Sequence, residues 1–346
     1  MRVVAIAGAK GGVGKTAAAV NLSIVAAMAG YRTLLWDLDP QGAATHCYKA
    51  KAKVKGGATR LLGGKRDLQS FTRRSEYPNL DLLPADASFR VVDTVLSTRR
   101  WPERVIRKLL RPLDRSYDVV VLDCAPGLGV VTESIVAASD LVLAPIVPAP
   151  LAVRSLDQLA DFVSDHRAGL QLLAFLSMLD ERKVLHRQMQ ELVRTDRRFA
   201  LSAIPVSSAV ERMGLEQVPA VLASPRNLAA SAYRGLWAEV DERLELGGAV
   251  PLDPSEFGLG DATEDVATGA VADAADGADG ADGAVVETAT EVVTVDSGVA
   301  PVEPPTVTTV AETVSVATAA DAAVPDDAVS AVIAGLLASG AQPPEA

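Results

Sequence analysis

Residues that several protein classes require are scarce in this sequence. Its 346 residues include only two cysteines, Cys47 and Cys124, and no C-x-x-C pair, which argues against a disulfide framework and against a cysteine-based zinc or redox motif. No apolar run reaches the roughly 18 residues that a membrane-spanning helix needs. The first apolar run is also too short for a secretory signal peptide. We therefore expect a cytoplasmic protein without a membrane span.

Basic residues are absent from one end of the chain. All 33 Lys and Arg residues lie in residues 1–250, which hold 26 of the 44 acidic residues and so carry a net charge of +7. Residues 251–346 contain the other 18 acidic residues and carry −18. Aromatic residues stop at Phe257, and such a composition cannot offset the entropy of ordering the chain. We predict a folded domain over residues 1–250 and a disordered acidic linker over 251–324; a second folded domain is the alternative.

An apolar pattern returns near the C-terminal end. Val329, Val332, Ile333, Leu336 and Leu337 follow the i, i+3, i+4, i+7, i+8 spacing of one helix face. The sequence thus predicts a possible short amphipathic helix over residues 325–340. It is an equally open interpretation that this spacing arose by chance in a segment rich in Ala and Val.

Short apolar runs alternate with helical stretches through residues 1–250. The runs are Val3–Gly8, Thr33–Trp36, Leu80–Leu83, Val119–Leu122, Leu141–Ile146 and Leu170–Leu176, and two clear helical patterns are Thr16–Ala29 and Pro225–Leu246. Continuous apolarity is typical of strands buried on both faces. We therefore predict an α/β fold with a doubly wound, mostly parallel sheet and helices on both faces.

A glycine-rich segment follows the first predicted strand and opens a helix. Residues 10–16 read KGGVGKT, and this context is typical of a phosphate-binding loop. Lys15 would reach the β- and γ-phosphates, and the Thr16 hydroxyl would bind Mg²⁺. The strict G-x-x-x-x-G-K-[ST] pattern fails at Ala9, and an additional lysine, Lys10, follows it. The predicted nucleotide-binding residues of the loop are Gly11, Gly12, Val13, Gly14, Lys15, Thr16 and Ala17.

Two aspartates lie at the ends of predicted buried strands. Asp39 and Asp123 are candidates for a Mg²⁺ site, because Mg²⁺ takes carboxylate or water ligands beside phosphates. Either aspartate alone could instead cap a helix. Their joint presence beside a phosphate loop favours the metal site.

KGGVGKT resembles the deviant Walker A loop of the ParA/MinD family of nucleoside triphosphatases. The blocks LLWDLDPQGAAT (Leu34–Thr45), NLDLLPAD (Asn79–Asp86) and YDVVVLDCAPGLGVVT (Tyr117–Thr132) are also similar, in order, and the resemblance covers residues 1 to about 245. It implies a P-loop fold, ATP and Mg²⁺, slow partner-stimulated hydrolysis, and a homodimer on ATP binding.

The resemblance also implies roles for single residues. Lys10 would reach the nucleotide of the other subunit, and Lys15 and Asp39 complete the catalytic set, with Asp39 orienting the attacking water. Asp123 would be the Walker B carboxylate and a Mg²⁺ ligand with Thr16 and Asp39, while Asp37 would support the loop. Asp180 and Pro205 lie where the family packs adenine. A plain loop role for either residue is an equally open interpretation.

The blocks Leu34–Thr45 and Asn79–Asp86 look like those of the DNA-partitioning branch of the family. That branch binds nonspecific DNA and is stimulated by a ParB-like or cargo-adaptor protein. Arg226 would contact DNA, and Arg212 would replace an arginine that the pattern has where this chain has Val206. A further basic cluster, Arg99, Arg100, Arg104, Arg107, Lys108 and Arg111, would line part of a helix and either add to DNA binding or form a solvated face.

We therefore predict a ParA-like ATPase, cytoplasmic and nucleoid-associated, that segregates or positions a cargo. Two alternatives stay open. One is a DNA-independent, nucleotide-switched scaffold at a pole or secretion machine. The other is a MinD-like membrane-recruited switch, which the acidic C-terminal end disfavours because anionic lipid would repel it. No membrane partner is expected.

Overall fold

One mixed sheet organises the computed structural model, which describes residues 1–64, 67–149 and 151–259. The strand order is β3-β4-β2-β5-β1-β6-β7-β8, and every neighbouring pair is parallel except the antiparallel edge pair β3–β4. The strands are β1 (Arg2–Ile6), β2 (Thr33–Asp37), β3 (Arg73–Arg74), β4 (Leu80–Leu83), β5 (Val119–Asp123), β6 (Leu141–Ile146), β7 (Gln171–Leu179) and β8 (Ile204–Pro205). This topology confirms the predicted doubly wound, mostly parallel fold.

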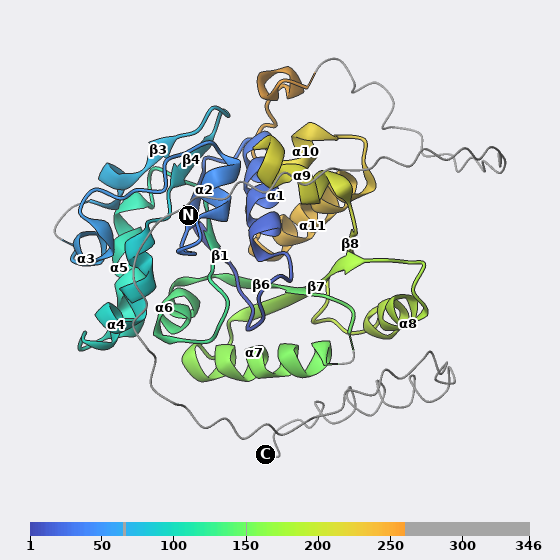
Figure 1. The fold of residues 1–346 in the computed structure, drawn as a ribbon, viewed down its shortest axis with the longest axis horizontal. Coiled ribbons are helices and arrows are strands. Elements are labelled where there is room, and N and C mark those ends of the chain that lie inside the picture. The colour runs from blue at the N-terminus through green and yellow to red at the C-terminus, as the bar shows by residue number, and fades with distance from the viewer. Residues whose placement is uncertain (65–66, 150, 260–346) are drawn as a thin grey trace, which may run out of the picture. The chain divides into compact units, whose positions relative to one another are not determined.

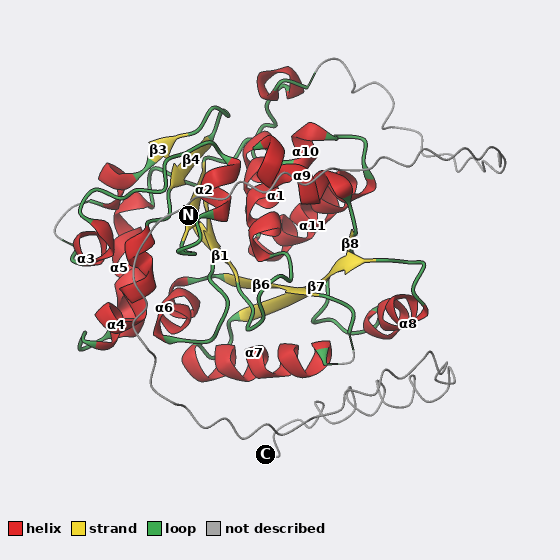
Figure 2. Ribbon diagram, in the orientation of Figure 1, coloured by secondary structure: helices red, strands yellow, loops and turns green. Residues whose placement is uncertain are grey.

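Helices cover both faces of the sheet (Figures 1 and 2). One layer contains α1 (Lys15–Met28), α2 (Ala43–Cys47), α9 (Ser208–Glu216), α10 (Ala220–Ala223) and α11 (Leu228–Leu244). The other contains α3 (Gly57–Leu62), α4 (Val92–Ser97), α5 (Val105–Leu110), α6 (Val130–Ala138), α7 (Ala152–His166) and α8 (Val184–Val193). Short 3₁₀ turns include η3 (Pro102–Arg104) and η5 (Pro254–Phe257).

Strand side chains alternate between the two cores. In β2, Leu34 and Trp36 pack in the core on the α3–α8 side, whereas Leu35 packs in the core on the α1 side. A strand whose side chains pack into an apolar core on each face has no polar face, which explains the continuous apolar runs in the sequence.

Element boundaries differ from the predictions at several ends. β7 continues to Leu179 rather than ending at Leu176. Helix α11 begins at Leu228 rather than Pro225, because the Asn227 side chain caps it by accepting a hydrogen bond from the Ala229 amide (2.8 Å). The sequence did not predict β3 and β8, which have two residues each and show no periodicity.

The packed body continues past residue 250. The Leu252 amide donates to the Met28 carbonyl at 3.0 Å. In η5, Phe257 is only 6% exposed and joins the core on the α1 side. The folded body therefore reaches at least Leu259, whereas the predicted terminal helix and nearly all of the predicted acidic linker lie outside the described residues.

The strand register brings three predicted site segments to one edge. Strand β5 lies between β1 and β2, and Asp123 is paired with Ile6 on one side and with Asp37 on the other. All three strands are parallel, so the segments that follow them meet at the carboxyl edge of the sheet. The glycine-rich loop follows β1 there.

Candidate functional site

The loop between β1 and α1 depends on glycine. Gly12 and Gly14 have φ values of 70° and 95°, a region that L side chains rarely adopt. A Cβ on Gly14 would also lie 2.7 Å from the Ser177 Oγ atom. Gly14 is the N-cap residue of α1, and no side chain caps that helix. Its first backbone N–H groups are therefore left to bind an anion.

The two lysines of the loop lie in different environments. Lys15 is 6% exposed, and its ammonium group donates to the Lys10 carbonyl. Burial lowers the Lys15 pKa, and the nearby Cys124, Asp123 and Asp39 oppose that shift. The side chain of Lys10 is exposed. Lys15 thus points into its own site, while Lys10 is accessible from outside.

Asp123 is a fully buried carboxylate beside the Thr16 hydroxyl. It is 0% exposed, and neither of its oxygens has a hydrogen-bond partner among the described residues. Burial raises its pKa well above the usual range, the Asp37 charge adds to this, and the Thr16 hydroxyl and Lys15 partly offset it. A buried polar group without a partner requires an explanation. A carboxylate beside a threonine hydroxyl and a phosphate loop fits a divalent cation.

Asp37 is bound by its own surroundings. One of its oxygens accepts hydrogen bonds from the Thr45 amide (2.8 Å) and the Thr45 hydroxyl (2.7 Å), and the other accepts from the Asp39 amide (3.2 Å). Burial raises the Asp37 pKa to about 6. Asp39 is half-buried and accepts a hydrogen bond from the Gln41 amide at 2.8 Å. Asp37 is therefore held by the segment that follows β2, whereas Asp39 remains partly exposed.

The remaining predicted contacts lie outside this cluster. Asp180 and Pro205 line one cavity of about 680 Å³, which no residue of the phosphate loop lines. The Asp180 carboxylate there forms an ion pair with Arg182 at 2.9 Å. Arg226 is exposed, whereas Arg212 is paired with Glu216 at 2.8 Å. The paired Arg212 is a weaker candidate for a phosphate contact.

Sequence reasoning missed two residues that shape the site. Thr45 joins the end of β2 to the segment after β4, because its hydroxyl also accepts a hydrogen bond from the Ala85 amide (2.8 Å). Ser177, near the end of β7, packs against the phosphate loop at Gly14. Neither contact has a local sequence signal, because each joins segments far apart in the chain.

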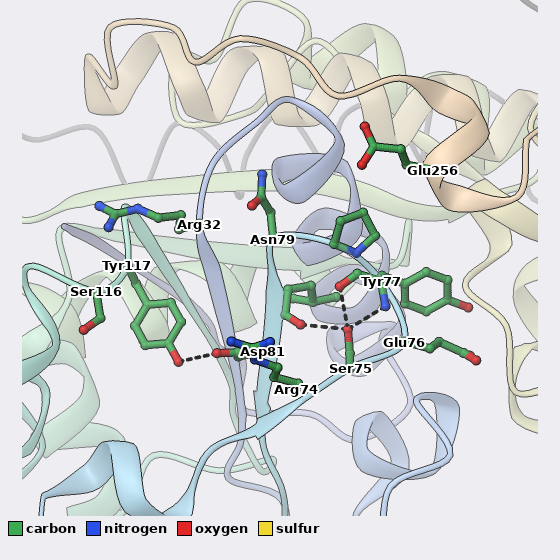
Figure 3. Close-up of a pocket in the computed structure, with 12 residues that line it drawn as sticks. Arg32, Arg74, Ser75, Glu76, Tyr77, Asn79, Asp81, Ser116, Tyr117 and Glu256 are labelled. Atoms are coloured by element: carbon green, nitrogen blue, oxygen red, sulfur yellow. Dashed lines mark hydrogen bonds between the residues drawn. The ribbon is translucent and has the colours of Figure 1, made fainter.

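Another cavity of about 640 Å³ lies at the opposite edge of the sheet, near the start of β4 (Figure 3). Two of its charged groups, Asp81 and Arg32, are paired within the protein. The Tyr117 hydroxyl donates to Asp81 at 2.7 Å, and Arg32 binds Asp118 through two nitrogens at 2.7 and 3.0 Å. This cavity is separate from the phosphate loop, and we assign it no function.

Among the described helices, none is long and apolar enough to cross a membrane. No three His, Cys, Asp or Glu side chains of the described residues form a metal-binding group. A cation at Asp123 would thus depend on the phosphates of a nucleotide for further ligands.

Known proteins are similar to this chain along most of its described length. Residues 1–171 match a family model described as an AAA domain. Sporulation initiation inhibitor protein Soj of Bacillus subtilis is 31% identical over 247 residues, which cover 69% of this chain and 98% of Soj. Chromosome partitioning protein ParA of Myxococcus xanthus is 34% identical over 199 residues, or 56% of this chain and 70% of that protein.

A solved structure has a similar fold. Cobyrinic acid a,c-diamide synthase from Mycobacterium smegmatis, with a bound ATP analog and magnesium, has a TM-score of 0.60 and 26% identity, covering 73% of this chain and 99% of that one. The phosphate loop, its added lysine and the strand-end aspartates lie within the regions of similarity. On this similarity, above all to nearly the full length of Soj, the chain belongs to the ParA/MinD family of ATPases.

Proposed function

We propose that this chain binds ATP with Mg²⁺, dimerises on ATP, binds nonspecific DNA, and segregates or positions a cargo when a partner stimulates hydrolysis. The observation that carries the proposal is the unpartnered, buried Asp123 carboxylate beside Lys15 and Thr16. Such an arrangement is costly unless a ligand completes it. The similarity to Soj and ParA supports the partitioning role.

Each group of the site has a task that matches its environment. The N–H groups of the loop and Lys15 would bind the phosphates, and Thr16 and Asp123 would hold Mg²⁺. When bound, Mg²⁺ supplies positive charge to the phosphate oxygens. The half-buried Asp39 would orient the attacking water. Lys10 is exposed, as a group that acts on the nucleotide of the other subunit must be.

The test combines ATP turnover with DNA binding. Wild-type protein should hydrolyse ATP slowly and cosediment with duplex DNA only when ATP is present. Asp39→Ala should abolish turnover but keep ATP-dependent dimerisation and DNA binding, because it removes the group that orients water and leaves the phosphate loop intact. Failure of the wild-type protein to bind ATP would refute the proposal.

One observation favours a second candidate, the DNA-independent switched scaffold. Val206 replaces an expected arginine, and Arg212 is already paired with Glu216. Dimerisation on ATP without any salt-sensitive DNA binding would favour this candidate. ATP-dependent binding to anionic vesicles would instead favour the MinD-like switch, against the charge of the C-terminal end.

A further inference from the structure

The segment from η3 through α5 and the 3₁₀ turn Arg111–Leu113 that follows has one apolar and one basic face. Ile106, Leu109, Leu110 and Leu113 are buried in the core. Arg104, Arg107, Lys108 and Arg111 follow i, i+3, i+4, i+7 spacing on the other face, and all four are exposed. Arg99 and Arg100, also exposed, immediately precede this segment. We call these six cations and the exposed Trp101 the α5 basic face.

Most charges of the α5 basic face have no acidic partner. Of these six cations, only Arg104 forms an ion pair within the described residues, with Glu103 at 3.3 Å. The nearest other acid along the chain, Asp114, instead binds the Met1 ammonium group at 3.3 Å. Arg107 and Arg111 also line a cavity of about 400 Å³ with Arg167. Asp114 and Asp140 line that cavity too, and Asp140 accepts the Val3 amide at 2.9 Å and lies 3.8 Å from Arg167.

An exposed tryptophan lies among these cations. Trp101 is 50% exposed, and the guanidinium carbons of Arg104 and Arg100 lie 4.7 and 5.5 Å from the centre of its ring. The other two tryptophans, Trp36 and Trp237, are 0% and 4% exposed. Cation–π contacts restrain the two arginines at the surface. Tryptophan and arginine are among the residue types that are enriched at interfaces.

Helix α5 is bonded to α6, and its carboxyl end lies away from the phosphate loop. The Ile106 amide donates to the Ser134 hydroxyl at 3.2 Å, which fixes α5 on α6. The chain runs from α5 into the amino end of β5, whereas the phosphate loop follows the carboxyl end of the parallel strand β1. The part of the surface from Arg107 to Arg111 can therefore bind a partner without competing for the phosphate loop.

We infer that the α5 basic face is a surface that binds the phosphate backbone of duplex DNA. The inference rests on the proposed function and names a DNA contact beyond Arg226. It fits because the contact predicted near Arg212 is weakened by Glu216, while the α5 basic face offers five cations without an acidic partner among the described residues. Each phosphate that a cation neutralises releases counterions, and a dimer presents the surface twice.

The experiment uses the full chain and two variants with the same change of charge. The test variant is Arg107→Gln, Lys108→Gln, Arg111→Gln. The matched control is Lys183→Gln, Arg187→Gln, Arg194→Gln, three exposed cations on or beside α8. Binding to a duplex of arbitrary sequence is measured with ATP over a salt series. Trp101 fluorescence is followed in parallel, with Trp101→Phe as the blank.

We expect the test variant to lose at least about tenfold in affinity at low salt and to flatten the salt slope by roughly 2.7 per protomer, about 0.9 for each lost phosphate contact. The control should retain the wild-type slope. DNA should also change Trp101 fluorescence. Equal slopes for the two variants, with wild-type binding intact, would overturn the inference and leave the proposed function standing.

Two further outcomes separate the alternatives. Wild-type protein that dimerises on ATP but binds no DNA would remove the DNA part of the proposed function and this inference with it. Trp101 that becomes accessible to acrylamide on adding salt, in full-length protein without DNA, would show that an anionic segment of the chain covers the surface. Together with a salt slope that the test variant leaves unchanged, that result would assign the α5 basic face to the acidic C-terminal residues alone and overturn the inference.

Discussion

Substitutions of the two lysines of the phosphate loop should cause different defects. Lys15 is buried beside Asp123, so Lys15→Ala should weaken ATP binding about 100-fold or more through the loss of charge-assisted hydrogen bonds. Lys10 is exposed, so Lys10→Ala should bind ATP almost normally but lose ATP-driven dimerisation and at least 100-fold in turnover. Calorimetry measures the binding, and analytical ultracentrifugation measures the dimer. A Lys10→Ala protein with wild-type turnover would exclude the role across the dimer.

Asp37 should make stability depend on pH. Its pKa is about 6 in the folded protein against 3.8 ordinarily, so the folded state retains a proton that the unfolded state loses. Stability therefore falls as pH rises from about 4 to about 6, and the Asp37 contribution is about 3 kcal/mol. Asp37→Asn retains an oxygen for Thr45 and has no such penalty. In urea unfolding without nucleotide, the free energy of unfolding of the variant should rise relative to that of wild type by about 3 kcal/mol between pH 4 and pH 7. Parallel pH curves would contradict this.

The chemistry of single residues was easier to predict than their contacts. Lys15, Thr16 and Asp123 could be proposed from the sequence because a phosphate loop and a strand-end carboxylate have short, local patterns. The dependence of Asp37 on Thr45 had no such pattern, since eight residues and a helix start separate them. That neither Asp123 oxygen has a hydrogen-bond partner among the described residues could be seen only in three dimensions.

At the scale of elements, the start of α1 depends on Gly14. Gly14→Ala places a Cβ at a φ of 95° and 2.7 Å from Ser177 Oγ, so we expect a loss of about 1–3 kcal/mol in the free energy of unfolding. Gly11→Ala is the matched control, because Gly11 has no positive φ and a Cβ there meets nothing within 4 Å. Its unfolding should change by less than about 0.5 kcal/mol. Urea denaturation without nucleotide compares the two, and equal losses would show that local strain at Gly14 is not the cause.

Elements buried on two faces were predicted well, and edge elements were not. Leu80–Leu83 and Leu141–Ile146 are strands with the predicted bounds, because both cores demand apolar side chains throughout. β3 and β8 are two residues long and are defined only by pairing with β4 and β7. The end of β7 at Leu179 likewise depends on the neighbouring strand β8, which periodicity does not reveal.

At the scale of the whole molecule, the α5 basic face shows what a charge count omits. Their spacing predicted that the six cations line part of one helix, but only Arg107 and Lys108 lie in α5 itself. Arg104 ends η3, Arg111 follows the end of α5, and Arg99 and Arg100 precede η3. Whether acidic side chains cover them depends on the neighbouring elements, and here Asp114 is bound to the Met1 ammonium group. The net charge of −11 conceals this surface, because the acidic C-terminal end outweighs the basic body.

That imbalance gives a prediction for the full chain. Residues 260–346 hold 16 acidic residues and no basic one, and they follow a body whose core already includes Phe257. Removing them should keep the fold and raise affinity for duplex DNA about tenfold at low salt, because their charge repels phosphate and competes for the same cations. The gain should vanish at high salt, where charges are screened. A full-length variant with these acids changed to Asn and Gln separates charge from length. If it binds as tightly as the truncation, charge is the cause; if it binds like wild type, the segment acts through its bulk or its apolar stripe instead.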